Sequence, residues 1–231
     1  MRRALSMLGA LVLTIVLAVL LLQGWYALHI WWWRDHPPRE TAFMALRLAE
    51  MRREDPRARL DYDWVPYERV ALPLKRALIA AEDAKFVEHE GFDWDGIEQA
   101  LDKNFRKGKV VAGGSTITQQ LAKNLFLSGA RSYWRKAEEA AITVMLEAML
   151  DKRRILELYV NVIEWGQGVF GCEAAARHYF HAACRDLNAD QAARLAAMAP
   201  NPRFYERNPN ARGLARKIGI IRTRMASAEL P

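Results

Sequence analysis

A long apolar segment at the N-terminus constrains this chain more than any other feature. From Ala4 to Trp33 the only side chain that titrates near neutral pH is His29, and the segment exceeds the roughly 20 residues that a helix needs to cross a bilayer. Aromatic residues such as Trp31 near its end are typical of a membrane interface. Because the segment lacks a convincing small-residue cleavage site, we interpret it as a retained anchor and not as a cleaved signal peptide.

The charges beside this segment predict its orientation. Arg2 and Arg3 precede the span, and basic residues tend to remain on the cytoplasmic side. We therefore expect a single-pass protein of the cytoplasmic (inner) membrane, with the N-terminus in the cytoplasm and the rest of the chain on the periplasmic side. The formal net charge of +7 favours anionic headgroups or phosphate-bearing ligands, and the location argues against nucleic acid.

The remainder of the sequence predicts a mostly α-helical protein. We expect a cytoplasmic N-terminus and anchor over residues 1–34, a connecting region over residues 35–70 and one domain over residues 71–231. Apolar residues recur at helical spacing through this domain, and no alternating run is long enough to indicate a convincing strand.

The sequence predicts two helices followed by a loop in the first part of this domain. Pro73 suits the first turn of a helix that runs to about Glu88, and a second helix is expected to begin near Asp93. A basic segment punctuated by glycines, from Lys103 to Gly114, is then expected to form a mobile loop.

The stretch from Gly113 to Asn124 combines a hinge with a helix start. Two glycines permit backbone conformations that other residues avoid, and Thr116 with Gln119 has the spacing of a capping box. In the helix that follows, one face is apolar and another carries an organised polar strip. The strip consists of Thr116, Gln120, Lys123 and Asn124. Hydroxyl, amide and ammonium groups in this arrangement suggest hydrogen bonding to an oxygen-rich ligand.

Two groups of charged residues could carry chemistry. A helix through residues 82–89 would place Glu82, Phe86 and His89 on one arc, where aromatic bulk could raise the proton affinity of the carboxylate and suit it to general base catalysis. The alternative for Glu82 is an ordinary solvated charge.

The second group lies on the helix near Trp134. Periodicity puts Arg135 on its core-facing stripe, and Arg131 too if the helix extends that far, so an anionic partner is expected. Helical geometry cannot choose between Glu138 and Glu139 as a second acid. The alternative is a simple intrahelical pair between Arg135 and Glu139.

The chain contains two cysteines, Cys172 and Cys184. Outside the cytoplasm they could form a disulfide. Two further interpretations stay open at the sequence level: a metal site that also uses His178 and His181, although its spacing matches no familiar zinc pattern, and two small buried residues.

Taken together, four segments resemble the successive motifs of glycosyltransferase family 51, the peptidoglycan transglycosylases. The segments are 82–93 (EDAKFVEHEGFD), 114–124 (GSTITQQLAKN), 135–139 (RKAEE) and 152–161 (KRRILELYVN). The resemblance covers residues 71 to about 180 and implies a lysozyme-like α fold with two lobes. Because the sequence ends at Pro231, we expect no transpeptidase domain. Val160, where the family usually has Leu or Met, is a small departure.

The resemblance also implies an activity and a set of site residues. The expected reaction is polymerisation of lipid II into β-1,4 glycan strands with release of polyprenyl diphosphate, by a single inverting displacement. Glu82 would be the general base and Glu139 the second acid near the donor diphosphate. The remaining expected substrate-binding residues are Lys123, Arg131 and Arg135 at the diphosphate, Thr116, Gln120 and Asn124 along the site, Lys152 in support, and Asp83, Phe86 and His89.

The resemblance implies partners as well. These are lipid II, the growing lipid-linked strand, the membrane and other cell-wall synthesis proteins. No cofactor or metal ligand is expected from the chain, although a divalent cation such as Mg or Mn could bridge the diphosphate. Two rival functions are a lytic muramidase on the same fold and a catalytically silent scaffold.

Overall fold

The computed structural model describes residues 2–109, 113–127 and 132–231. The chain divides into two compact units, Met1–His36 and Pro37–Pro231, which are described separately. The expected loop from Lys103 to Gly114 therefore lies partly outside the described residues, and Arg131 lies wholly outside them.

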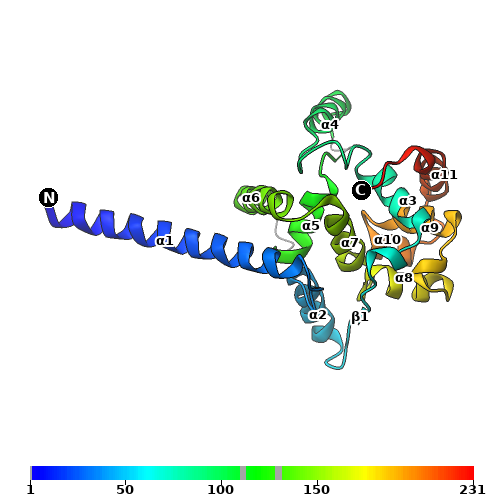
Figure 1. The fold of residues 1–231 in the computed structure, drawn as a ribbon, viewed down its shortest axis with the longest axis horizontal. Helices are drawn as coiled ribbons and strands as arrows, with labels where there is room; N and C mark the ends of the chain where they lie inside the picture. Colours follow the sequence, from blue (N-terminus) through cyan, green and yellow to red (C-terminus); the bar gives the residue numbers. More distant parts are fainter. Residues whose placement is uncertain (1, 110–112, 128–131) are drawn as a thin grey trace. The chain divides into compact units, whose positions relative to one another are not determined.

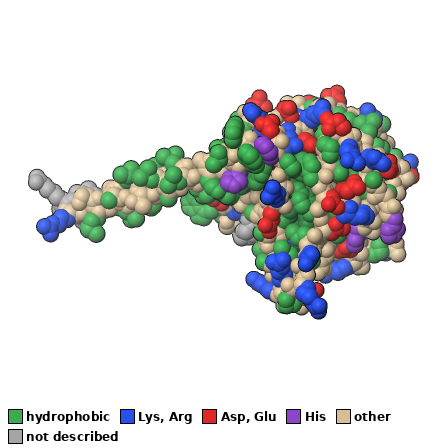
Figure 2. Space-filling view, turned by 60° about the horizontal axis from the view of Figure 1, so that its bottom comes forward, with side chains coloured by type: hydrophobic (Ala, Val, Ile, Leu, Met, Phe, Trp, Pro, Cys, Tyr) green, Lys and Arg blue, Asp and Glu red, His purple; other side chains and the backbone are tan. Residues whose placement is uncertain are grey.

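The first unit is built on one helix, α1 (Arg2–Trp33). Its segment Ser6–Trp33 has a mean hydropathy of 2.5, so by length and composition the helix could cross a membrane. Leu8, Leu21 and many similar side chains are exposed along it. Figure 2 shows hydrophobic side chains along most of this helix. The apolar helix predicted from the sequence is present.

The second unit is also mostly helical, as predicted. Its helices are α2 (Ala42–Glu54), α3 (Leu72–Glu82), α4 (Trp94–Lys107), α5 (Ile117–Phe126), α6 (Tyr133–Met149), α7 (Lys152–Val162), α8 (Gly171–Phe180), α9 (Ala189–Met198), α10 (Pro202–Arg207) and α11 (Leu214–Arg224). Short 3-10 turns are η1 (Tyr67–Arg69), η2 (Cys184–Asp186) and η3 (Met225–Ser227). In the described residues the strands are short: β1 (Asp61–Tyr62), β2 (Glu164–Gly166) and β3 (Val169–Phe170), in the order β1-β3-β2.

The helices of this unit pack in two groups (Figure 1). In one group α3, α9 and α11 contact one another, and η3 closes on α3. In the other group α5 contacts α2, α6 and α7. Fully buried aromatic side chains, Tyr159 and Trp165 among them, fill the core. The end of α3 and the start of α5 consequently face each other across the boundary between the groups.

Helix α3 ends earlier than predicted. It stops at Glu82, and the segment that contains Phe86 and His89 is a series of turns, so the expected helical arc through residues 82–89 is wrong. The cause is Asp83, which caps the helix at φ −162° and uses its carboxylate for contacts outside α3. Short acidic side chains compete with helix continuation in this way.

Helix α4 extends farther than predicted. It begins after the N-cap Asp93, as expected, but continues to Lys107, so Lys103 belongs to a helix and not to a loop. Its last turn is basic, which complements the helix dipole, and it ends at Gly108, whose φ of 62° suits glycine.

The two cysteines form a disulfide, which settles the alternatives left open by the sequence. Cys172 of α8 is bonded to Cys184 of η2, and both residues are fully buried. The carboxylate of Glu173 also accepts a hydrogen bond from the Cys184 N–H at 2.9 Å. The covalent bond and the hydrogen bond together hold η2 against α8.

Replacing both cysteines, Cys172→Ala with Cys184→Ala, should destabilise the protein by about 2–3 kcal/mol, because a loop of this length is no longer closed in the unfolded chain. Thermal unfolding of the full chain in detergent measures the effect, and wild-type protein treated with a reductant provides the parallel comparison. An unchanged unfolding temperature in the double variant would show that the bond contributes nothing to stability.

Candidate active site

The start of α5 is fixed by the capping box predicted from the sequence. The Thr116 hydroxyl accepts from the Gln119 N–H, and the Gln119 side chain accepts from the Thr116 N–H. The Thr116 hydroxyl also donates to the carbonyl of Gly91 at 2.7 Å. Thr116 is buried, its polar atoms orient α5, and the residue lines a cavity.

Asp83 joins the end of α3 to this helix start. Its Oδ2 accepts from the Ile117 N–H at 3.0 Å, and its Oδ1 lies 2.8 Å from His89 Nε2. Because His89 Nδ1 accepts from the Gly91 N–H at 3.2 Å, Nε2 is the nitrogen that donates to Asp83. Asp83 and His89 thus clamp the turns after α3 onto the N-terminus of α5, where a carboxylate is favourable.

Glu82 makes the second link between these helices. Its Oε2 accepts from Gln120 Nε2 at 2.9 Å, and Gln120 Oε1 accepts from the hydroxyl of Tyr159 at 3.0 Å. Tyr159 is fully buried, and burial keeps its pKa well above the usual value, so it remains a donor. The relay from Tyr159 through Gln120 therefore fixes the direction of the amide and holds the Glu82 carboxylate in place.

The surroundings of Glu82 alter its acidity. Burial raises the pKa of its carboxyl group, while the hydrogen bond from Gln120 and the positive charge of Lys217 lower it. The negative charge of Asp83 raises it further. Glu82 Oε1 is buried and has no hydrogen-bond partner among the described residues. An elevated pKa and an unused acceptor are properties that suit a general base.

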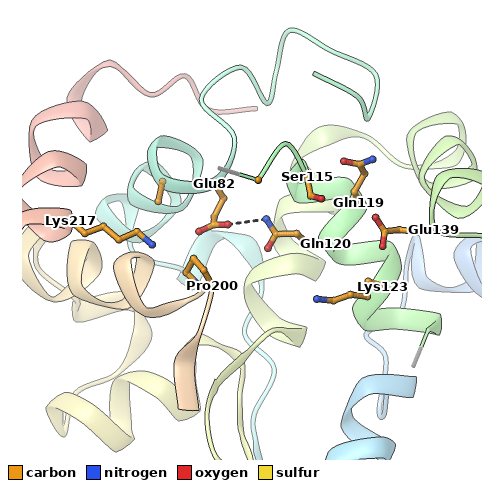
Figure 3. A pocket seen from close by; sticks show the side chains of 10 residues that line it. Glu82, Ser115, Gln119, Gln120, Lys123, Glu139, Pro200 and Lys217 are labelled. Atoms are coloured by element: carbon orange, nitrogen blue, oxygen red, sulfur yellow. Dashed lines mark hydrogen bonds between the residues drawn. The ribbon is translucent and has the colours of Figure 1, made fainter. Parts of the chain in front are cut away.

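Glu82 lines a cavity of about 400 Å³ between the two helix groups (Figure 3). The other lining residues are Ala81, Gly113, Ser115, Gln119, Gln120, Lys123, Glu139, Pro200 and Lys217. A neighbouring cavity of about 190 Å³ shares Glu82 and Ser115 with it, and one of about 200 Å³ shares Gln120 and Lys123. The three cavities therefore adjoin through common residues.

A cluster of charges lies on the opposite side of the central cavity from Lys217 (Figure 3). The Glu139 carboxylate is buried. Its Oε2 accepts a hydrogen bond from Arg135 Nη1 at 2.7 Å, and its other oxygen forms an ion pair with Lys136. Burial lowers the pKa of the nearby Lys123 ammonium, Glu139 raises it, and the positive charge of Arg135 lowers it. Three cations thus converge around one carboxylate, which leaves a net positive charge at this end of the cavity.

This geometry distinguishes the two acids that helical periodicity could not. Glu139 is 3% exposed and lines the cavity, whereas Glu138 is more exposed and lines none of the three cavities. The intrahelical pair of Arg135 with Glu139 is also present. The ion pair with Arg135 does not remove Glu139 from the cavity. It holds the Glu139 carboxylate at the cavity wall.

The predicted site residues do not all meet in one place. Glu82, Gln120, Lys123 and Glu139 line the central cavity, whereas Asp83 and Thr116 line one adjoining cavity and Asn124 the other. Asn124 Nδ2 donates to the carbonyl of Gln120 at 2.7 Å. Arg135 reaches the site through Glu139. Phe86, His89 and Lys152 line none of these three cavities.

Lys152 and Phe86 contact each other outside the three cavities. Lys152 Nζ lies 2.8 Å from Glu147 Oε1 and 4.7 Å from the centre of the Phe86 ring. The same Glu147 oxygen accepts from the Thr118 hydroxyl of α5 at 2.5 Å. Lys152 is therefore tied to α5 through Glu147.

Several lining residues were not predicted from the sequence. Ser115 follows the glycine hinge, and Pro200 and Lys217 come from the distant C-terminal part of the chain. Arg47 of α2 and Arg203 of α10 line the cavity beside Lys123, and both pair with Glu164 at 3.0 and 2.8 Å. The basic residues at 216 and 217 were visible in the sequence, but nothing local indicated which of them faces a cavity.

The described residues include no group of three or more His, Cys, Asp or Glu side chains that could hold a metal ion. The charged groups that line the central cavity are instead the carboxylates of Glu82 and Glu139 and the ammonium groups of Lys123 and Lys217, with the Arg135 guanidinium bound to Glu139. Such a site can accept a proton at one end and bind an oxyanion at the other.

Comparison with known proteins identifies the family. A family model described as Transglycosylase matches residues 49–226. Among similar proteins, each named biosynthetic peptidoglycan transglycosylase, that of Chromobacterium violaceum is 61% identical over 217 residues, which cover 94% of this chain and 95% of the relative. That of Methylobacillus flagellatus is 60% identical over 221 residues, 96% of each chain. That of Aromatoleum aromaticum is 54% identical over 231 residues, 100% of each chain. With one family model over most of its length and relatives matched almost from end to end, this chain belongs to the transglycosylase family.

Proposed function

We propose that this chain is a peptidoglycan glycosyltransferase that polymerises lipid II into β-1,4 glycan strands and releases polyprenyl diphosphate. The names of its relatives support the reaction class, and nothing in them favours a lytic muramidase. The observation that carries the proposal is the central cavity, which has a buried carboxylate with an unused acceptor on one side and a cationic cluster on the other.

Glu82 is the general base of the proposed reaction. The acceptor sugar hydroxyl loses its proton to the Glu82 carboxylate while its oxygen forms a bond to the anomeric carbon of the donor. The bond from that carbon to the diphosphate oxygen breaks at the same time. One displacement of this kind inverts the anomeric configuration and forms no covalent glycosyl-enzyme.

The cationic cluster acts on the leaving group. Negative charge grows on the diphosphate as its bond to the sugar breaks, and preorganised ammonium and guanidinium donors stabilise that charge. Lys123 lines the cavity directly, and Glu139 holds Arg135 and Lys136 at its wall. Because the diphosphate departs as an anion that these cations stabilise, it needs no strong acid.

The membrane is part of the proposed mechanism. Both substrates carry polyprenyl chains, so an anchor that confines the enzyme to the same surface raises their effective concentration. We place the anchor in the inner membrane with residues 37–231 on the periplasmic side. The charges of Arg2 and Arg3 support this orientation, and so does the buried disulfide, because disulfides persist in oxidising compartments.

The diphosphate can be bound without a resident cofactor in this proposal. Lys123, Arg135 and Lys136 supply the positive charge, and a divalent cation that bridges the diphosphate would arrive with the substrate. Other cell-wall synthesis proteins are proposed partners.

Glu82→Gln should abolish polymer formation, with a loss of at least about 10²-fold, because the amide cannot accept the proton. Gel analysis of products from labelled lipid II measures the loss, and thermal unfolding shows whether the variant remains folded. Polymerisation at the wild-type rate by the folded variant would remove Glu82 from the role of base.

Lys123→Met should lower kcat/KM for lipid II by about 10²-fold, because one donor to the developing diphosphate charge is lost. Lys107→Met, which removes an exposed lysine at the end of α4, is the matched control and should retain the wild-type value. Equal values for the two variants would contradict a role of Lys123 in diphosphate binding.

Addition of a chelator should leave residual polymerisation well above that of Glu82→Gln, because the cations of the chain remain in place. The initial rate with labelled lipid II is measured with chelator and again after excess Mg²⁺. Complete loss with chelator and full recovery with Mg²⁺ would show that a divalent cation is obligatory.

A further inference from the structure

The proposed base occupies an unfavourable position for a charge. Glu82 accepts one hydrogen bond from the neutral amide of Gln120, and its other oxygen is buried without a partner among the described residues. Burial of an ionised carboxylate is costly unless an opposite charge offsets it. A base must nevertheless be ionised before it can accept a proton. Some group near Glu82 therefore has to favour its charged form.

Lys217 is placed to do this from the other side of the cavity. It extends from α11 into the central cavity, and in Figure 3 its ammonium points toward Glu82. Lys217 Nζ donates one hydrogen bond to the carbonyl of Ala197 at 3.0 Å, which positions the side chain against the end of α9. An ammonium group has three N–H donors, so this bond leaves donors for other partners.

The electrostatic effects of Lys217 and Glu82 are reciprocal. Burial lowers the pKa of Lys217, and the negative charge of Glu82 raises it. Lys217 in turn lowers the pKa of Glu82, against the effect of burial. The two groups thus stabilise each other's charged forms inside the cavity.

Among the charged groups around Glu82, Lys217 is the cation whose charge lowers the pKa of Glu82. Asp83, the adjacent residue, carries a negative charge that raises the pKa of Glu82. From α5 and α7, Gln120 and Tyr159 approach as neutral groups, and the hydrogen bond from Gln120 lowers the pKa of Glu82 without supplying a charge. Lys123 of α5 acts mainly with the cluster around Glu139 of α6. Arg224, which precedes η3, lines the adjoining cavity together with Glu82.

We propose that Lys217 is a positioning residue for the proposed base, whose fixed positive charge keeps the Glu82 carboxylate ionised in the central cavity and thus ready to accept the proton of the acceptor hydroxyl. This inference rests on the proposed function, because it assigns Lys217 a role in the proton transfer of that reaction. Lys217 is separated from Glu82 by more than half of the chain and lies outside the segments that carry the family resemblance.

The dependence of kcat/KM on pH tests this role, because its acid limb reports the ionisation of the essential base in the free enzyme. The assay uses the full chain in detergent with labelled lipid II. Three variants are compared with wild type: Lys217→Met, Lys217→Gln and Lys217→Arg. Arg222→Met is the matched control, since it removes a positive charge from the same helix at an exposed pair with Asp190.

We expect the acid limb to move to higher pH by about one unit in Lys217→Met and Lys217→Gln, because loss of the neighbouring cation disfavours the carboxylate. On the acid side kcat/KM should then fall about tenfold, and at alkaline pH most of the loss should disappear. In Lys217→Arg and Arg222→Met the limb should stay at the wild-type pH.

Two results would overturn the inference. A loss by the same factor at every pH would show that Lys217 only supports the cleft, and a higher KM with an unmoved limb would show that it binds substrate. Thermal unfolding checks that each variant is folded, and Lys217→Gln, which can still donate a hydrogen bond, substitutes for Lys217→Met if the latter does not fold. Polymer formation by wild type and its loss in Glu82→Gln test the proposed function separately.

Discussion

Two adjacent carboxylates at the end of α3 hold the site together. Asp83 accepts the first free N–H of α5, and Glu82 accepts from the Gln120 amide one turn farther along the same helix. These bonds join the two groups of helices at the point where the central cavity opens. These bonds help to fix the spacing between the carboxylate proposed as base and the cation proposed to bind the leaving group, which belong to different helices.

The same arrangement separates two kinds of electrostatic environment within one cavity. Near Glu82 the surroundings are mostly neutral, and the hydrogen bond from Gln120 together with the ammonium of Lys217 opposes the effect of burial on the carboxylate. Near Lys123 three cations surround Glu139, and the excess positive charge is left for a ligand. Burial lowers the pKa of both lysines, because removal of an ammonium group from water disfavours its charged form. Buried charged groups with shifted pKa values are common at functional sites, where they reduce the stability of the fold.

Local sequence rules predicted much of the fold and part of the site. The capping box of Thr116 with Gln119 and the amphipathic helices follow from short-range spacing, which the structure reproduces. The end of α3 could not be found in this way, because the partner that stops it, the Ile117 N–H, lies far along the chain. For the same reason periodicity could not choose between Glu138 and Glu139, or indicate that Lys217 enters the cavity. In each case a tertiary contact decides the outcome.

The proposed base and the leaving group should occupy opposite ends of one cavity, and a crystal structure with a non-hydrolysable analogue of the lipid-linked donor would show whether they do. We expect phosphate oxygens within hydrogen-bonding distance of Lys123 and close to the Arg135 and Glu139 pair, with the anomeric carbon directed toward Glu82. A diphosphate bound at Lys217, with its sugar directed away from Glu82, would be incompatible with the roles proposed for Lys123 and Glu82.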